Sequence, residues 1–412
     1  MNQALRFVSY FGFLLARFFL FPFYFLSGFV SRRPDLWVFG SWGGYRFADN
    51  SASFFLYCQR ELKEGVRPVW ISRTPDIVTS LREQGYEAHW IWSLHGVWCC
   101  LRAKLYIFDS FSKDINFWTS RKATKVNLWS GVPLKAFERD IDNPRSRYYR
   151  LFHGSLPERW FLALMMPWHV DRSDLIISTS PEMAEITRRA FDLPEEAVVI
   201  TGYPRNDVMF LSAEAATNSQ RNWPASFKAA VDAKRQIFMY LPTYRDSGSP
   251  YFDLDWTDLD QLMQTLGATF FYKFHPDDKS TFRGRGTHIV ELPMETDIYS
   301  MMAYTDALIS DYSSIIFDYM LLERPIIYYA PDMEEFIASS RSLIFDPNDI
   351  AVGPVCSTAA ELMESLTDVV NEVHDSANKR ADWAATRRRF NAYVDGDSCR
   401  RTAETIYSKL LN

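Results

Sequence analysis

Short apolar runs alternate with amphipathic helical patterns along most of this chain, and this alternation limits the folds open to it. In the first half, apolar runs at 36–39 and 67–71 precede helical patterns at 50–64 and 77–84. Such an alternation predicts parallel sheets that carry helices on both faces, which is an α/β fold. The predicted strands are 36–39, 67–71, 104–108, 125–129, 174–177, 197–200, 236–240, 270–273, 288–290, 307–309 and 325–329.

A polar stretch at 212–225 divides these strands into two series. Two Rossmann-like domains that face each other across a cleft form the GT-B arrangement, and ligands in such sheets bind at the carboxyl ends of the strands. We expect a helix at 400–410 to return to the first half. The predicted segments are a membrane anchor at 1–33, an N-terminal Rossmann-like domain at 34–211, a C-terminal Rossmann-like domain at 212–398 and a C-terminal helix at 399–412.

The N-terminal segment is rich in aromatic side chains. Two apolar runs, 7–16 and 18–30, flank Arg17. Neither run reaches the roughly 18 to 20 apolar residues that a spanning helix needs, and a charge near the bilayer centre is costly. We therefore expect an interfacial or re-entrant membrane anchor, with Arg32 and Arg33 on the cytoplasmic side. A buried hairpin is the alternative, and a signal peptide is disfavoured because no small-residue cleavage site follows.

Charge and cysteine content argue against several classes of function. The chain has a net charge of −6, which gives no indication of nucleic-acid binding. Its five cysteines form no C-x-x-C pair, and this suits a reducing cytosol rather than a disulfide scaffold or a zinc site. We find no cluster with the spacing of metal ligands, so we expect no bound metal and no cofactor. The sequence leaves open whether identical chains form a homo-oligomer.

The segment 309–318 has the composition of a phosphate-binding turn. The apolar run before it ends in Ser310 and Asp311, and Ser313 and Ser314 then precede a helical pattern. Ser and Asp cap helices, and the free N–H groups at a helix start attract anions. The alternative is an ordinary helix cap in a doubly wound sheet.

Six further motifs accompany this turn. They are Phe39–Gly44, Trp129–Lys135, Gly202–Asp207, Leu241–Arg245, Lys273–Pro276 and Asp395–Arg400. Together the seven motifs resemble the CDP-glycerol glycerophosphotransferase family, the teichoic-acid primases and polymerases of bacterial envelopes. The resemblance covers most of the chain, from about Val38 to Arg400.

The resemblance implies a GT-B transferase that moves glycerol phosphate, or a related polyol phosphate, from a CDP-activated donor to a hydroxyl of a lipid-linked or polysaccharide acceptor. It implies that the N-terminal domain binds the acceptor and the C-terminal domain binds the donor, at the cytoplasmic face of the bacterial plasma membrane. Two other functions stay open: a GT-B glycosyltransferase that uses a nucleotide sugar, and a non-catalytic assembly partner. The sequence does not distinguish glycerol from ribitol, or a primase from a polymerase.

The resemblance also gives roles to single residues. It implies that His275 contacts the pyrophosphate or the leaving group; a histidine packed at a strand end is the alternative. For Arg205, a structural ion pair with Asp207 is the alternative to a donor contact. The predicted donor-binding residues are Arg205, Thr243, Arg245, Pro276, Ser310, Asp311, Ser313, Ser314, Asp318, Ser398 and Arg400, and the predicted acceptor-side residues are Gly131 and Lys135.

One position departs from the family pattern. The family motif reads Trp-His-Gly-Thr-Pro-Leu-Lys, and the resemblance implies that its histidine is the general base, but this chain has Ser130 there. An unperturbed serine hydroxyl does not accept a proton near pH 7. Another group acts as the base, or the acceptor is anionic or the transition state loose, or the reaction is changed or lost. We retain Ser130, His153 and His275 as candidate catalytic residues, and the other candidate bases are Glu138, Asp140 and Asp142.

Overall fold

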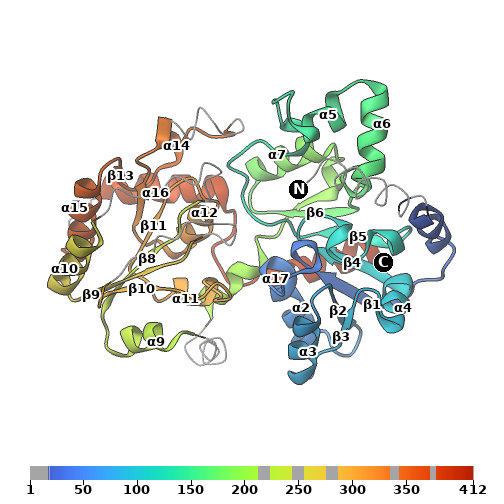
Figure 1. The fold of residues 1–412 in the computed structure, drawn as a ribbon, viewed down its shortest axis with the longest axis horizontal. Coiled ribbons are helices and arrows are strands. Elements are labelled where there is room, and N and C mark those ends of the chain that lie inside the picture. Colours follow the sequence, from blue (N-terminus) through green and yellow to red (C-terminus); the bar gives the residue numbers. More distant parts are fainter. Residues whose placement is uncertain are drawn as a thin grey trace, which may run out of the picture.

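Two parallel β-sheets, one in each half of the chain, form the framework of the protein (Figure 1). We describe the computed structural model at residues 17, 19–211, 223–243, 255–274, 286–334, 343–371 and 377–411. The paired strands of both sheets run parallel. The predicted α/β class is therefore confirmed.

The first sheet has seven strands in the order β3-β2-β1-β4-β5-β6-β7. Helices cover both faces, so the apolar residues 36–39 of β1 are completely buried. The six strands predicted for this half are confirmed, whereas β3 was not predicted because it has three residues and lacks an apolar run. The strands are β1 (Arg33–Gly40), β2 (Arg67–Ser72), β3 (Ala88–Trp90), β4 (Ala103–Phe108), β5 (Thr124–Asn127), β6 (Leu175–Ser178) and β7 (Val198–Ile200).

The second sheet has six strands in the order β10-β9-β8-β11-β12-β13. Its five predicted strands are confirmed, and the sixth, β13, was missed because it spans only two residues. The central strand β11 lies between β8 and β12, so its carboxyl end opens toward the middle of the sheet edge. The strands are β8 (Gln236–Tyr240), β9 (Ala268–Tyr272), β10 (Ile289–Glu291), β11 (Ala307–Ser310), β12 (Ile326–Tyr329) and β13 (Val355–Cys356).

Helices begin where capping residues follow the strands. The first turn of α7 shows why: the Ser180 hydroxyl accepts the N–H of Met183, and Pro181 occupies the first helical position. The helices of the first half are α2 (Asp49–Glu61), α3 (Pro75–Glu83), α4 (Leu94–Arg102), α5 (Arg147–His153), α6 (Leu156–Met165) and α7 (Pro181–Phe191). Those that follow are α9 (Ala225–Asp232), α10 (Trp256–Leu266), α11 (Tyr299–Met302), α12 (Ile315–Tyr319), α14 (Pro347–Ile350), α15 (Ala359–Val370), α16 (Ala377–Phe390) and α17 (Ser398–Ile406).

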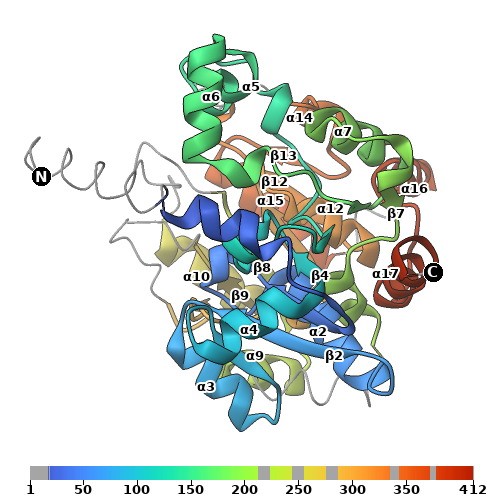
Figure 2. The same ribbon diagram turned by 90° about the vertical axis from the view of Figure 1, so that its right-hand side faces the viewer.

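The C-terminal helix α17 returns to the first half, as expected from the sequence. It packs against α2 and against the 3₁₀ segment η7 (Pro204–Phe210). The Asp207 carboxylate accepts the N–H groups of Ser398 at 2.9 Å and Cys399 at 2.7 Å, so it caps the start of α17. Figure 2 shows α16 and α17 along one side of the molecule.

The described part of the N-terminal segment is helical at residues 19–27 and lies against the first half. Arg17 is buried between the rings of Trp118 and Trp168 and donates to the Leu164 carbonyl at 2.7 Å. The Tyr24 ring stacks on Phe117 at 4.6 Å between centroids. Among the described residues, none of the helices has the length and apolar character that crossing a membrane requires.

The two arginines after this segment, which we expect on the cytoplasmic side of a membrane, have partners within the protein. The Arg32 guanidinium donates to four backbone carbonyls of the first half at 2.6–3.3 Å. Arg33 forms an ion pair with Asp35 at 2.9 Å. Arg32 therefore anchors the segment to its own domain through its two Nη atoms.

Candidate active site

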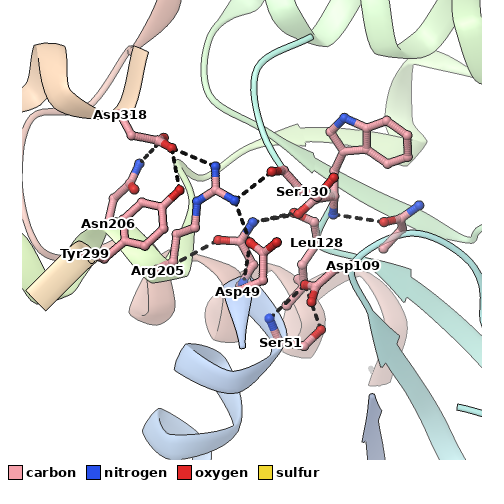
Figure 3. Close-up of polar contacts among 12 residues, drawn as sticks. Asp49, Ser51, Asp109, Leu128, Ser130, Arg205, Asn206, Tyr299 and Asp318 are labelled. Carbon is pink, nitrogen blue, oxygen red and sulfur yellow. Dashed lines mark hydrogen bonds and ion pairs between the residues drawn. The ribbon is translucent and has the colours of Figure 1, made fainter. Parts of the chain in front are cut away.

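Arg205 lies at the junction of the two halves and joins them through charged hydrogen bonds (Figure 3). Its Nη1 donates to Asp49 Oδ1 at 2.5 Å and to the Ser130 carbonyl at 2.6 Å. Its Nη2 donates to Asp318 Oδ2 at 2.7 Å. Burial alone would lower the pKa of Arg205, but the neighbouring Asp318 and Asp49 carboxylates raise that pKa well above its usual value. The guanidinium is therefore a permanent cation held between carboxylates from both halves.

Asp318 is the second centre of this junction and is almost completely buried. Besides Arg205, it accepts hydrogen bonds from Asn206 Nδ2 at 2.9 Å and from the Tyr299 hydroxyl at 3.0 Å. The alternative pairing of Arg205 with Asp207 is wrong, because Asp207 caps α17 instead. The structure thus gives Arg205 and Asp318 partners within the protein, and a direct donor contact for either residue stays a prediction.

The loop after β5 is fixed by Asn50, the second residue of α2. Its Nδ2 donates to the Leu128 carbonyl at 3.1 Å and to the Trp129 carbonyl at 2.6 Å. Trp129 has a left-handed backbone with φ 48°, and its N–H is held by Asn127 Oδ1 at 2.9 Å. The side chain of Ser130 is exposed. Side-chain amides and Arg205 therefore set the path of the segment in which the family histidine is replaced.

Gly131 brings this loop against the second half. A Cβ atom on Gly131 would lie 3.1 Å from Ser314 Oγ and 3.1 Å from Arg205 Nη2, and its φ is +149°. Only glycine fits this conformation and close approach. Lys135 then forms an antiparallel bridge with Leu343 of the second half. The predicted acceptor-side residue Gly131 and the predicted donor-side residue Ser314 therefore meet.

The turn after β11 is built by Ser310 and Asp311, which are both buried. The Ser310 hydroxyl donates to the Leu241 carbonyl at 2.7 Å. The Asp311 carboxylate accepts the Thr243 N–H at 2.9 Å and the Tyr312 N–H at 2.6 Å. These two residues hold the segment after β8 beside the turn, whereas residues 313 and 314 are partly exposed and Ser314 lies next to Gly131.

Ser398 and Arg400 lie at the start of α17. Ser398 is buried, and its N–H is used by Asp207. The half-exposed Arg400 forms ion pairs with Asp397 and Glu404, both at 2.9 Å. Among the described residues, no contact joins this pair to the turn after β11, so their donor contact stays a prediction. The predicted residues Arg245, His275 and Pro276 lie outside the described residues.

The candidate bases that were to replace the family histidine have other partners. His153 is exposed on α5, where its Nε2 lies 2.7 Å from the Arg139 carbonyl, and α5 lies apart from α12 in both overall views (Figures 1 and 2). Glu138 is buried against His169, with Nδ1–Oε distances of 3.1 Å. Asp140 is paired with Arg189 at 2.7 Å, and Asp142 is exposed. Whether one of these groups acts as the base stays a prediction.

The structure brings three possible metal ligands together at one place, although their sequence spacing did not predict a metal site. Ligand atoms of Glu87, His89 and Cys99 lie within 4.8 Å of one another. Arg67, however, donates to both oxygens of Glu87, and Arg82 Nη2 lies 3.0 Å from His89 Nδ1. A metal on His89 Nε2 would require a proton on Nδ1, directly against the Arg82 donor. These neighbours therefore argue against a metal at this cluster.

The positions that organise the junction were not all found from the sequence. Asp49 and Asn50 follow the predicted strand at 36–39, but neither residue was predicted to belong to the site. The role of Tyr299 could not be predicted from the sequence, because an aromatic residue at the start of a helix is common in protein cores. Partners that are distant in sequence, such as residues 205 and 318, can be found only from the fold.

Comparison with known proteins places this arrangement in a family. The family model described as CDP-glycerol:poly(glycerophosphate) glycerophosphotransferase matches residues 22–408. The chain belongs to this family. The match includes both sheets, the Arg205 junction and the turn after β11, so the resemblance predicted from the seven motifs is confirmed.

Individual relatives cover most of the chain at low identity. The teichoic acid glycerol-phosphate transferase of Staphylococcus aureus (strain NCTC 8325 / PS 47) is 23% identical over 401 residues, covering 92% of this chain and 95% of that protein. The teichoic acid ribitol-phosphate primase of Bacillus spizizenii (strain ATCC 23059 / NRRL B-14472 / W23) is 26% identical over 340 residues, covering 79% and 80%. The wall teichoic acid polymerase TagF superimposes with a TM-score of 0.71 at 22% identity, covering 92% of this chain and 89% of that one. The last match shows that the two-sheet fold is shared.

Proposed function

We propose that this family member transfers glycerol phosphate, or a related polyol phosphate, from a CDP-activated donor to a hydroxyl of a lipid-linked or polysaccharide acceptor in cell-envelope polymer synthesis. The observation that carries the proposal is the contact of Gly131 with Ser314. It joins the loop that the resemblance assigns to the acceptor with the turn that it assigns to the donor, which supports the proposal. Family membership supports the CDP-polyol donor, and relatives named for glycerol and for ribitol leave the polyol open.

The reaction needs an environment that tolerates a pyrophosphate. The acceptor oxygen attacks the β-phosphorus of the donor, the bond from that phosphorus to the bridging oxygen breaks, and CMP leaves with the electron pair. Lys273, which directly follows β9, donates to the Thr296 carbonyl at 2.7 Å; burial lowers its pKa, and the nearby Asp297 carboxylate opposes that shift. Cations and N–H donors placed around the phosphates would stabilise the charge that develops as CMP leaves.

The direct test is CMP release from CDP-glycerol. We expect release that depends on a lipid-linked glycerol-phosphate acceptor, and a product that contains phosphate. Release of a nucleoside diphosphate from a nucleotide sugar, with a phosphate-free product, would favour the glycosyltransferase alternative. Binding of CDP-glycerol without turnover would favour the assembly partner.

The donor turn gives a sharper prediction. Replacing Ser313 and Ser314 together with alanine is expected to weaken CDP binding by about 1–3 kcal/mol, because hydroxyl groups that bond to a charged phosphate are lost. Both side chains are partly exposed, so the fold should remain intact. Calorimetric titration with CDP measures the change. Unchanged affinity in a folded variant would remove these residues from the donor site.

Exposed apolar side chains support a membrane-associated location. Phe25 and Phe29 of the N-terminal segment are 51% and 85% exposed, and Trp160 of α6 is 78% exposed. The segment and α6 lie side by side, since Arg17 bonds to Leu164 of α6 and the views in Figures 1 and 2 agree. Exposed aromatic side chains on neighbouring elements fit the interfacial layer of a bilayer. We infer peripheral attachment at the cytoplasmic face of the plasma membrane.

Removing residues 1–31 is expected to move the protein from the membrane fraction to the soluble fraction. Because the deletion also uncovers Phe117 and Trp118, a second variant keeps the segment and replaces only Phe25 and Phe29 with glutamate. This variant retains the buried contacts but should lose affinity for anionic lipid vesicles in a flotation assay. Full flotation of both variants would show that the attachment surface lies elsewhere.

A further inference from the structure

Three consecutive backbone carbonyls in the loop after β5 point into the protein. Asn50 Nδ2 holds the carbonyls of Leu128 and Trp129, and Arg205 Nη1 holds the carbonyl of Ser130. Asn50 and Arg205 are both buried, at 0% and 4% exposure. Their donors therefore fix the orientation of the peptide groups that follow Leu128, Trp129 and Ser130.

This orientation determines where two N–H groups point. In a trans peptide the C=O and the N–H lie in one plane and point in opposite directions. The Ser130 N–H therefore points away from the Asn50 amide, and the Gly131 N–H points away from the Arg205 guanidinium. Within the part of the chain that the structure describes, neither N–H has a hydrogen-bond acceptor, although Gly131 is buried. Buried N–H groups without a partner are rare in native proteins, so the Gly131 N–H calls for a ligand, and the N–H of the exposed Ser130 is open to the same ligand.

The surroundings of the amide pair suit an anion. Ser314 Oγ and Arg205 Nη2 are both 3.1 Å from the position of a Cβ on Gly131. The Ser314 hydroxyl makes no hydrogen bond to another described residue, so it can donate to the same ligand. Asp49 and Asp318, the two carboxylates of the junction, each form an ion pair with Arg205, which offsets their negative charge. A hydroxyl group of the second half thus lies beside Gly131 of the first half.

We propose that the N–H groups of Ser130 and Gly131 bind the phosphoryl group that is transferred, together with the Ser314 hydroxyl. This inference rests on the proposed function and deepens it. As the acceptor oxygen bonds to the β-phosphorus and the bond to the bridging oxygen of CMP breaks, the two amides donate to the non-bridging oxygens that carry the charge. Asn50 and Arg205 are positioning residues, since they act through the loop. The site uses the backbone at residue 130, which explains how its side chain can be serine.

The most selective test removes one N–H at a time. Incorporating the α-hydroxy acid in place of Ser130, or glycolic acid in place of Gly131, converts that amide into an ester and leaves the side chains unchanged. Binding of CDP-glycerol should weaken by about 10-fold or more, because a hydrogen bond to a charged group is lost. Binding of CMP, which lacks the β-phosphate, should not change. Equal binding of CDP-glycerol by ester and native protein, or equal loss for CMP, would overturn the proposal.

A second test uses the positioning residue with a matched control. Asn50→Asp keeps the oxygen that accepts the Arg205 N–H but loses the amide that holds two carbonyls, whereas Gln59→Glu changes an amide of the same helix that donates only to the Pro68 carbonyl. We expect Asn50→Asp to lower CDP-glycerol affinity and CMP release while CMP affinity is retained, and Gln59→Glu to change none of them. Loss of both affinities together would indicate a structural role for Asn50 and count against the proposal. If wild-type protein fails to bind CDP-glycerol, the proposed function itself fails, which these variants distinguish from loss of the amide pair.

Discussion

Replacing Arg205 with alanine is expected to destabilise the protein by about 3–5 kcal/mol. Removing one partner of a buried ion pair leaves the other charges buried without compensation. Here the guanidinium serves Asp49, Asp318 and the Ser130 carbonyl at once. Urea denaturation of the purified variant measures the change in the free energy of unfolding. The loss should be larger than for an ordinary surface ion pair, because Arg205 also joins the two halves.

A matched control is Arg188→Ala on α7. Arg188 forms a bidentate ion pair with the Glu185 carboxylate, but this pair is exposed. Exposed pairs contribute little because water and salt screen them. The control should therefore unfold at nearly the wild-type urea concentration. If Arg205→Ala behaved like the control, the junction would not hold the halves together as its geometry indicates.

Replacing His275 with alanine is expected to lower CMP release by about 100-fold or more while CMP binding stays measurable. The family resemblance assigns His275 to the pyrophosphate or the leaving group, and a group that interacts with the departing oxygen acts mainly on the transition state. Steady-state assays of kcat, with calorimetry of CMP, separate the two effects. The control is His95→Ala, an exposed imidazole that stacks on His89 in the first half. A His275→Ala variant with wild-type kcat would exclude this role.

The fold was largely predictable from the sequence because both sheets are parallel. Strands buried on both faces appear as continuous apolar runs, such as 104–108 and 307–309, and these runs stand out between polar helical faces. β3 and β13 escaped prediction because strands of two or three residues lack a distinguishable periodicity. The burial of Arg17 and the backbone contacts of Arg32 were also missed. Long side chains with cationic ends are expected at a surface, yet backbone carbonyls and indole rings provide their partners here.

The site was predictable where a motif is local, and not where partners come from distant segments. The turn at 310–314 was located from its Ser and Asp content, and the structure places it against Gly131. The partners of Arg205 were not predictable, because Asp49 and Asp318 lie 156 and 113 positions away. The free amides of Ser130 and Gly131 leave no trace in the sequence, since every residue except proline carries an N–H.

The return of α17 makes the first half a discontinuous unit, with the second half nested inside it. The chain leaves the first half near Phe210 and re-enters it near Gly396, where a Cβ would lie 3.0 Å from Phe210 Cβ. Cutting the chain once, after Leu211, would strip Cys399 and Ile406 from the core that they share with Cys58. Excising 212–395 and ligating the adjoining ends would instead keep Cys58, Cys399 and Ile406 in one chain. The two passages of the chain between the halves therefore lie side by side at Phe210 and Gly396.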